Sequence, residues 1–152
     1  MSTLATSGVP TVSINKSVHV RRAPEDAFHL FVDEIGRWWP LHTGKYTYNA
    51  EKAQDVILEA HVGGRFYERY TDREEFTIGQ VLEFDRPNRV LFTWAAGFDP
   101  PTEVEVRFIP ENDGTRVDME HRAAESVPLK GHGFEGGWDE VLSYFVAAAS
   151  AT

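Results

Sequence analysis

The sequence predicts an α+β fold in which a curved, seven-stranded antiparallel sheet wraps around a long C-terminal helix. Apolar and polar residues alternate through most of seven segments, as in half-buried strands, and short turn-forming links such as Gly63-Gly64 make the later strands antiparallel. Helical apolar spacing occurs near both ends of the chain, where a pure sandwich or barrel would not place helices. The predicted strands are residues 12–22, 54–62, 65–72, 75–85, 89–96, 102–109 and 115–123.

Two short helices are predicted after the first strand and one long helix at the end of the chain. Pro24 suits the first turn of a helix. The apolar stripe of this helix consists of Phe28, Phe31, Val32 and Ile35. A further helical turn at 37–39 ends at Pro40, and residues 41–53 and 124–133 are predicted loops. The last helix has its apolar face at Phe134, Trp138, Val141, Leu142, Phe145 and Ala149.

The dimensions of these elements suggest a cavity. Seven strands about 4.8 Å apart give a sheet nearly 30 Å wide, whereas a helix is only about 10–12 Å across. One helix covers such a sheet only if the sheet curls around it. A curled sheet that grips a helix leaves space where a small molecule can bind, unless large side chains fill it.

Composition narrows the class of protein. The 152 residues include 15 basic and 24 acidic side chains, a net charge of −9, which argues against a nucleic-acid partner. There is no cysteine, which excludes disulfides and thiolate metal sites. We expect one domain at residues 12–150 after a flexible stretch, 1–11, with no signal peptide, no membrane insertion, no cofactor, no metal and a cytoplasmic location.

Strand parity places three polar residues, Lys16, Glu68 and His121, on the inner face of the sheet. A buried carboxylate or imidazole needs a partner. Glu68 and His121 either satisfy one another or a backbone group, or orient the polar end of a ligand, or act as an acid–base pair. Lys16 is expected to extend outward from near a strand end. Of the adjacent Trp38 and Trp39, either both belong to the core or one caps the entrance of the cavity.

Two motif matches do not predict sites. Residues 131–136 fit G-x-G-x-x-G, but a dinucleotide site needs a second parallel strand after the helix, and the chain ends at Thr152. Glu25, His29 and Asp33 share one helical face opposite the apolar stripe, so we interpret them as a solvated face rather than metal ligands.

An ordered set of segments resembles a known family. The segments are Trp38-Trp39-Pro40, Gly63-Gly64-Arg65-Phe66-Tyr67-Glu68, Gly79-Gln80-Val81-Leu82-Glu83-Phe84, Arg89-Val90-Leu91-Phe92-Thr93-Trp94, 102–108, 114–117, Glu120-His121-Arg122 and Gly137-Trp138. Over residues 12–149 the chain resembles the AHSA type of SRPBCC protein, the homologues of the activator of the heat-shock-protein-ninety ATPase, within the START and Bet v superfamily. Phe66 stands where the family usually has Trp, and His61 where it usually has Arg.

The resemblance implies a helix-grip fold with a deep hydrophobic cavity between the sheet and the C-terminal helix. Relatives bind lipids, sterols or polyketides, some are cyclases or dehydratases, and the family has no universal catalytic residue. The candidate ligand-binding residues are Trp39, Leu58, Phe66, Glu68, Tyr70, Trp94, Val106, Phe108, Met119, His121, Trp138 and Leu142.

We therefore expect a protein that binds a small hydrophobic or amphipathic molecule. The first alternative is a stress-related interaction module with a chaperone as its partner, although the chain has no room for the extra N-terminal domain of the chaperone-regulating members. The weaker alternative is a cyclase, dehydratase or hydrolase that uses Glu68 and His121.

Overall fold

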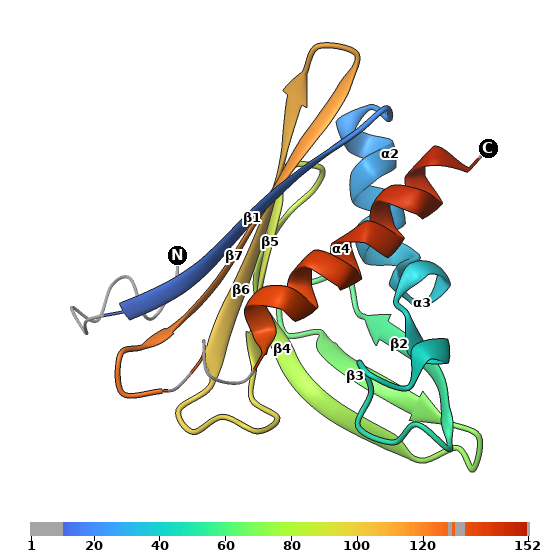
Figure 1. Ribbon diagram of the computed structural model, residues 1–152, viewed down its shortest axis with the longest axis vertical. Coiled ribbons are helices and arrows are strands. Elements are labelled where there is room, and N and C mark those ends of the chain that lie inside the picture. The colour runs from blue at the N-terminus through green and yellow to red at the C-terminus, as the bar shows by residue number, and fades with distance from the viewer. Residues whose placement is uncertain (1–10, 128, 130–132, 152) are drawn as a thin grey trace.

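The computed structural model describes residues 11–127, 129 and 133–151 (Figure 1). Seven strands form one antiparallel sheet in the order β1-β7-β6-β5-β4-β3-β2, which confirms the predicted architecture. The strands are β1 Thr11–Val20, β2 Ala53–Leu58, β3 Arg65–Tyr70, β4 Glu75–Asp85, β5 Arg89–Trp94, β6 Thr102–Glu111 and β7 Gly114–Ala124. Of the stretch predicted to be flexible, residues 1–10 lie outside the described residues, and Thr11 opens β1.

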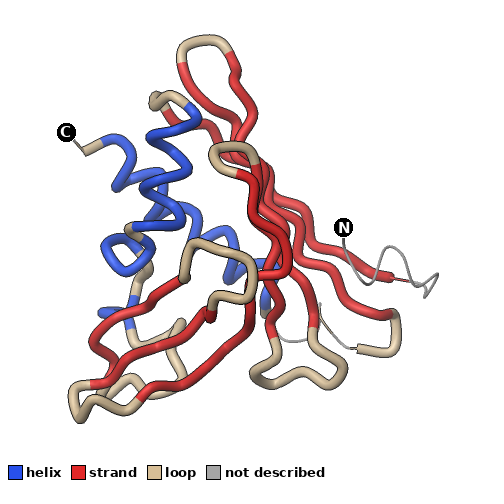
Figure 2. The backbone as a smooth tube through the Cα atoms, turned by 180° about the vertical axis from the view of Figure 1, so that it is seen from behind, coloured by secondary structure: helices blue, strands red, loops and turns tan. Residues whose placement is uncertain are grey.

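The sheet bends sharply, and the helices lie inside the bend (Figure 2). The pairing register shifts in β3–β4 at Phe66/Tyr67 and in β4–β5 at Val81/Glu83, and such irregularities curve a sheet. A Cβ atom on Gly79 would overlap the backbone oxygen of Thr93, so only glycine permits the close approach of β4 and β5 at this bend.

The helices after β1 differ in detail from the prediction. The segment predicted as one helix consists of α2 Pro24–Phe28 and a π-helical turn, η1 His29–Asp33, and it breaks at Glu34 (φ −115°, ψ 29°). Helix α3 (Ile35–Trp38) and a 3₁₀ turn, η2 (Leu41–Thr43), follow. All four residues of the predicted stripe are at most 2% exposed.

Helix α4 (Phe134–Ser150) lies across the concave side of the sheet and packs against β1 and α3 (Figure 1). Its predicted apolar positions Trp138, Val141, Leu142, Phe145 and Ala149 are buried. No helix in the described parts of the chain is both long and apolar enough to cross a membrane.

The predicted second strand ends four residues early. The backbone N–H of Glu59 already bonds to Arg65 and that of Gly64 to His61, so residues 59–64 form the turn. As a result Val62, which alternation along the predicted strand 54–62 would place on the same inner face as Val56 and Leu58, is 64% exposed.

Side chains fill much of the space between α4 and the sheet, contrary to the expectation of a continuous cavity. Phe31 lies at the centre of this packing, with ring-centroid distances of 5.0 Å to Phe145, 4.9 Å to Trp38 and 5.7 Å to Phe108. The helix backbone alone is too narrow to cover the sheet. Over the C-terminal half of α4, aromatic side chains fill the space that this leaves.

Candidate functional site

A pocket of about 260 Å³ remains at the N-terminal end of α4. It lies between the first two turns of that helix, the segment 45–48 that follows η2, and the end of β5. The residues that line it are Trp39, Lys45, Tyr46, Thr47, Tyr48, Trp94, Gly133, Phe134, Gly137, Trp138 and Val141.

Three tryptophans form the apolar part of the pocket. The ring centroids of Trp39, Trp94 and Trp138 lie 6.1–6.4 Å from one another. Each indole N–H already donates to a protein acceptor: that of Trp39 to the carbonyl of Tyr46 (2.9 Å), that of Trp94 to the hydroxyl of Tyr48 (2.8 Å), and that of Trp138 to His121 (3.0 Å). The surface left for a ligand is therefore the aromatic ring of each residue.

A buried carboxylate holds the segment 45–48 in place. Glu68, on β3, is 1% exposed and accepts hydrogen bonds from the Thr47 hydroxyl (2.9 Å), the Tyr48 backbone N–H (3.1 Å) and the Tyr70 hydroxyl (2.9 Å). Burial and the bond to Glu68 together raise the pKa of Tyr70. Thr47 and Tyr48 line the pocket, so Glu68 fixes one wall from behind.

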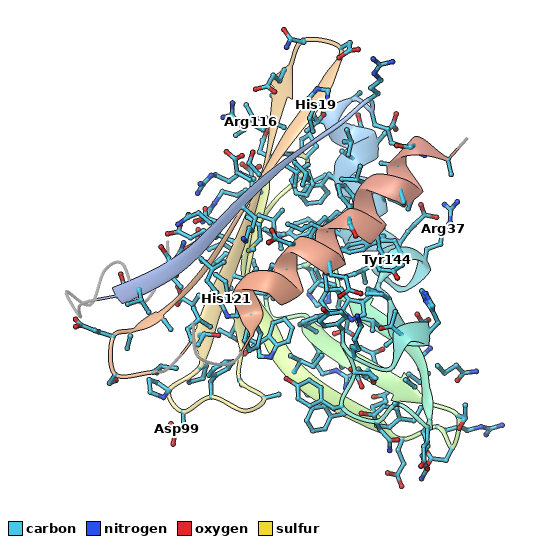
Figure 3. All side chains as sticks on the ribbon, in the orientation of Figure 1. His19, Arg37, Asp99, Arg116, His121 and Tyr144 are labelled. Atoms are coloured by element: carbon cyan, nitrogen blue, oxygen red, sulfur yellow. The ribbon has the colours of Figure 1, made fainter. Side chains whose placement is uncertain are left out.

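His121 fixes the opposite wall, near the start of α4 (Figure 3). It is fully buried on β7; its Nδ1 accepts from Trp138, and its Nε2 lies 2.7 Å from the hydroxyl of Thr102. Because Nδ1 must accept, the proton resides on Nε2, and the Thr102 hydroxyl donates onward to the carbonyl of Trp94. Burial lowers the pKa of His121 to about 3, so the ring is neutral near pH 7.

The rim of the pocket carries a charged cluster. Glu140 on α4 accepts hydrogen bonds from Lys45 and from the hydroxyl of Tyr46, both at 2.8 Å. The bond to Lys45 lowers the pKa of Glu140, and the same bond raises the pKa of Lys45. The lysine charge is therefore matched by a carboxylate at the rim.

Comparison with known proteins identifies the family. The profile of the family described as "Activator of Hsp90 ATPase homolog 1-like protein" matches residues 21–150. The chain belongs to this AHSA1-like family. None of the curated proteins matches it.

Solved structures of AHSA1-like and related proteins share the fold. A Mesorhizobium loti protein superposes with a TM-score of 0.66 at 16% identity, over 93% of this chain and 100% of the other. The Aha1 dimer of Colwellia psychrerythraea gives 0.65 at 17% identity (91% and 96% covered), and an AHSA1-like protein of Aeromonas hydrophila gives 0.63 at 23% (93% and 97%). At these identities the likeness establishes the fold alone.

Three of the twelve candidate ligand-binding residues, Trp39, Trp94 and Trp138, line the pocket of this AHSA1-like protein. The other nine are buried away from its lining: Leu58, Phe66, Glu68, Tyr70, Val106, Phe108, Met119, His121 and Leu142. Glu68 and His121 do not bond to each other, and each has its own hydrogen-bond partners. Glu68 is linked to the pocket through Thr47 and Tyr48, and His121 is linked to it through Trp138.

The other polar and aromatic candidates are also placed. Lys16 reaches outward to an ion pair with Asp139 at 3.0 Å, as predicted, although it does so from the middle of β1 rather than from near its end. Trp38 packs in the core, 5.3 Å from Phe145 between ring centroids, while its neighbour Trp39 is 7% exposed and lines the pocket.

The helical face interpreted as solvated carries an ion pair. Asp33 receives two hydrogen bonds from Arg86 and lies 2.7 Å from His29. Both oxygens of the Asp33 carboxylate thus accept hydrogen bonds from the Arg86 guanidinium, so this carboxylate is already engaged and not open to a metal ion.

The wall made by residues 45–48 was hard to foresee from the sequence. Tyr46 and Tyr48 lie in a stretch without periodicity, and two tyrosines in an otherwise polar loop are the one signal available. Gly137 was also missed: a Cβ atom there would lie 3.3 Å from the Tyr46 ring, so the absent side chain leaves room at the pocket. Of the G-x-G-x-x-G match, Gly131 and His132 lie outside the described residues.

Proposed function

We propose that this AHSA1-like protein binds a compact apolar or amphipathic molecule in the pocket at the N-terminal end of α4. The observation that carries the proposal is the lining itself: three indole rings, with their N–H groups already bonded, next to a rim of polar side chains. Apolar walls with a few convergent polar groups are typical of small-molecule sites.

The volume favours a small ligand over a lipid or sterol. At about 260 Å³ the pocket lies below the roughly 300–1,000 Å³ usual for drug-sized ligands. The packing of Phe31, Trp38 and Phe145 stops it from extending along α4. A fragment of about ten non-hydrogen atoms at roughly 0.4 kcal/mol each gives a Kd near 1 mM, which sets the concentrations for a test.

The test uses 2-phenylethanol as the probe and a pair of neighbouring glycines as the control. Gly137→Leu adds a side chain whose Cβ atom would lie 3.3 Å from the Tyr46 ring, whereas a Cβ atom on the exposed Gly136 meets nothing within 4 Å. Gly136→Leu therefore adds the same side chain to the same helix outside the pocket. We expect binding, followed by tryptophan fluorescence and NMR shifts, to weaken at least tenfold in Gly137→Leu and to persist in Gly136→Leu. Equal binding by both variants, or no binding by the parent protein, would contradict the proposal.

The alternatives have less support. Chaperone docking rests on the family description, and stimulation of a chaperone ATPase by the purified protein would support it. A cyclase, dehydratase or hydrolase reaction needs Glu68 and His121 to face a substrate, but both side chains are at most 1% exposed and engaged by protein groups.

A further inference from the structure

The Glu68 carboxylate is buried without a positive partner. Its hydrogen bonds come from three neutral donors, one of which, the Tyr48 N–H, is shared between both oxygens, and it forms no ion pair with any residue that the structure describes. Hydrogen bonds satisfy its oxygens but leave its unit charge uncompensated. In a poorly solvated environment the field of such a charge extends further than in water.

This charge lies directly behind the pocket. Two of its donors, Thr47 and Tyr48, line the pocket, so a ligand touching them is one side chain away from the carboxylate. Partial burial raises the pKa of the Tyr48 phenol, which is 45% exposed, and the nearby Glu68 carboxylate adds to this rise. The backbone N–H of Tyr48 joins the carboxylate directly to this wall of the pocket.

The other charged groups that the structure describes around the pocket do not form an ion pair with it. Lys45 and Glu140 are paired at 2.7 Å and sum to zero. The N-terminus of α4 adds a positive partial charge of about half a unit, smaller than the full charge of Glu68. Among the described residues around the pocket, Glu68 is thus the charge that has no ion-pair partner, within a chain whose formal net charge is −9.

The aromatic rings of the pocket provide a second interaction that favours a cation. The face of an indole ring attracts a cation, most strongly where water is excluded, and Trp39, Trp94 and Trp138 are each at most 7% exposed. From the uncompensated carboxylate and the three indoles we propose that the ligand of this pocket is an organic ammonium with a small apolar body. This inference rests on the proposed function and names the class of its ligand.

The test compares three probes built on one phenylethyl body. These are phenethylammonium (cation), 2-phenylethanol (neutral) and 3-phenylpropanoate (anion), titrated into the full chain at low salt. A unit charge about 10 Å away, at an effective dielectric constant of about 20, corresponds to a ten- to twentyfold change in affinity. We expect the cation to bind at least tenfold more tightly than the neutral probe, and the anion to bind most weakly.

Glu68→Gln removes the charge of this side chain and keeps one oxygen that can accept from the three donors. Glu51 is exposed, so Glu51→Gln is the control that changes the net charge by the same amount without altering the pocket. We expect the ratio of cation to neutral affinity to fall about tenfold in Glu68→Gln and to stay within twofold in Glu51→Gln. Because the ratio is taken within one variant, a general loosening of the wall affects both probes alike. Lys45→Met, which frees Glu140, is expected to raise the affinity for the cation severalfold.

The outcomes separate the two proposals. Equal affinity for cation and neutral probe would overturn the ammonium inference and leave the proposed function standing. Preference for the anion, weakened by Lys45→Met, would overturn it in favour of a site formed by Lys45 and the start of α4. Binding of none of the three probes would overturn both.

Discussion

The two ends of α4 cover interiors of different kinds. Over its C-terminal half, Phe145 packs with ring centroids 5.0 Å from Phe31 and 5.3 Å from Trp38, and this closed end is filled by aromatic contacts. Over its N-terminal half, the open end, a pocket remains between the helix, the segment 45–48 and the end of β5. Aromatic residues are abundant at both ends, so residue type alone does not decide whether the space is filled.

The difference lies in how the side chains are fixed. At the open end, Trp94 and Trp138 are held by hydrogen bonds to Tyr48 and His121, and the polar wall is held by Glu68. At the closed end Phe31, Phe108 and Phe145 pack ring against ring without polar atoms, and Trp38 adds one hydrogen bond, from its indole N–H to the carbonyl of Leu30. Ring contacts also occur at the open end, where the directional bonds to Tyr48 and His121 additionally hold two of the indoles in place beside the pocket.

The largest effect is expected at the closed end. Phe145→Ala removes a fully buried ring and should lower the free energy of unfolding by about 3–5 kcal/mol. Phe134→Ala, at the half-buried rim of the open end, should cost about 1 kcal/mol, because water already reaches that ring. Urea unfolding of both variants measures the difference. Equal losses would mean that the two ends do not differ in packing.

Acidification should weaken the open end through His121. Its pKa is about 3 in the folded protein and about 6.5 when exposed, so the unfolded chain binds the additional proton between these values. The contribution of the neutral ring to the free energy of unfolding is therefore fully present above pH 6.5 and is lost as the pH falls toward 3. The loss is about 1.4 kcal/mol per pH unit, which amounts to about 2–3 kcal/mol at pH 4.5.

His121→Gln isolates this contribution, because glutamine cannot take up the proton yet can accept from Trp138 and donate to Thr102. The stability difference between the parent and the variant should narrow as the pH falls from 6.5 to 4.5. Unfolding curves at several pH values supply the measurement. Parallel pH profiles for the two proteins would show that His121 is not the responsible group.

The fold was largely predictable because alternation and helical spacing report which side of an element is buried. The alternation of residues 102–109 and 115–123 correctly identified β6 and β7, and the spacing of residues 134–149 identified α4. The π-helical turn His29–Asp33 was not predictable, since it leaves the apolar stripe buried as an α-helix would. The exposed Val62 shows the limit of parity, which does not say where a strand stops.

The site was predictable only in part. Parity found Glu68 and His121 on the inner face, but their partners Thr47 and Trp138 are 21 and 17 residues away along the chain. A single sequence holds no signal for such pairings. The cavity argument used backbone spacing and took no measure of side-chain volume, which explains why it overestimated the hollow.

A smaller effect is expected from the hydroxyl of Tyr70, which donates to Glu68 at 2.9 Å inside the open end. Tyr70→Phe leaves the carboxylate with fewer donors and should cost about 2 kcal/mol, the usual range for a buried hydrogen bond to a charged group. Tyr67→Phe is the matched control on the same strand, since its hydroxyl only accepts a 3.2 Å bond from the partly exposed Arg69. Urea unfolding of the two variants supplies the comparison. A loss in Tyr67→Phe as large as that in Tyr70→Phe would contradict the role given to the Glu68 hydrogen bonds.

The smallest effect is expected where a polar contact at the same end of α4 faces water. Lys16 bonds to Asp139 at 3.0 Å, but the Asp139 side chain is 65% exposed, so solvent screens the pair. Lys16→Met keeps the apolar stem of the side chain and should change the free energy of unfolding by less than about 0.5 kcal/mol. When unfolding is measured at low and at high salt, the added salt should reduce even this difference. A loss above about 1.5 kcal/mol would mean that exposed ion pairs, and not only buried hydrogen bonds, hold the open end together.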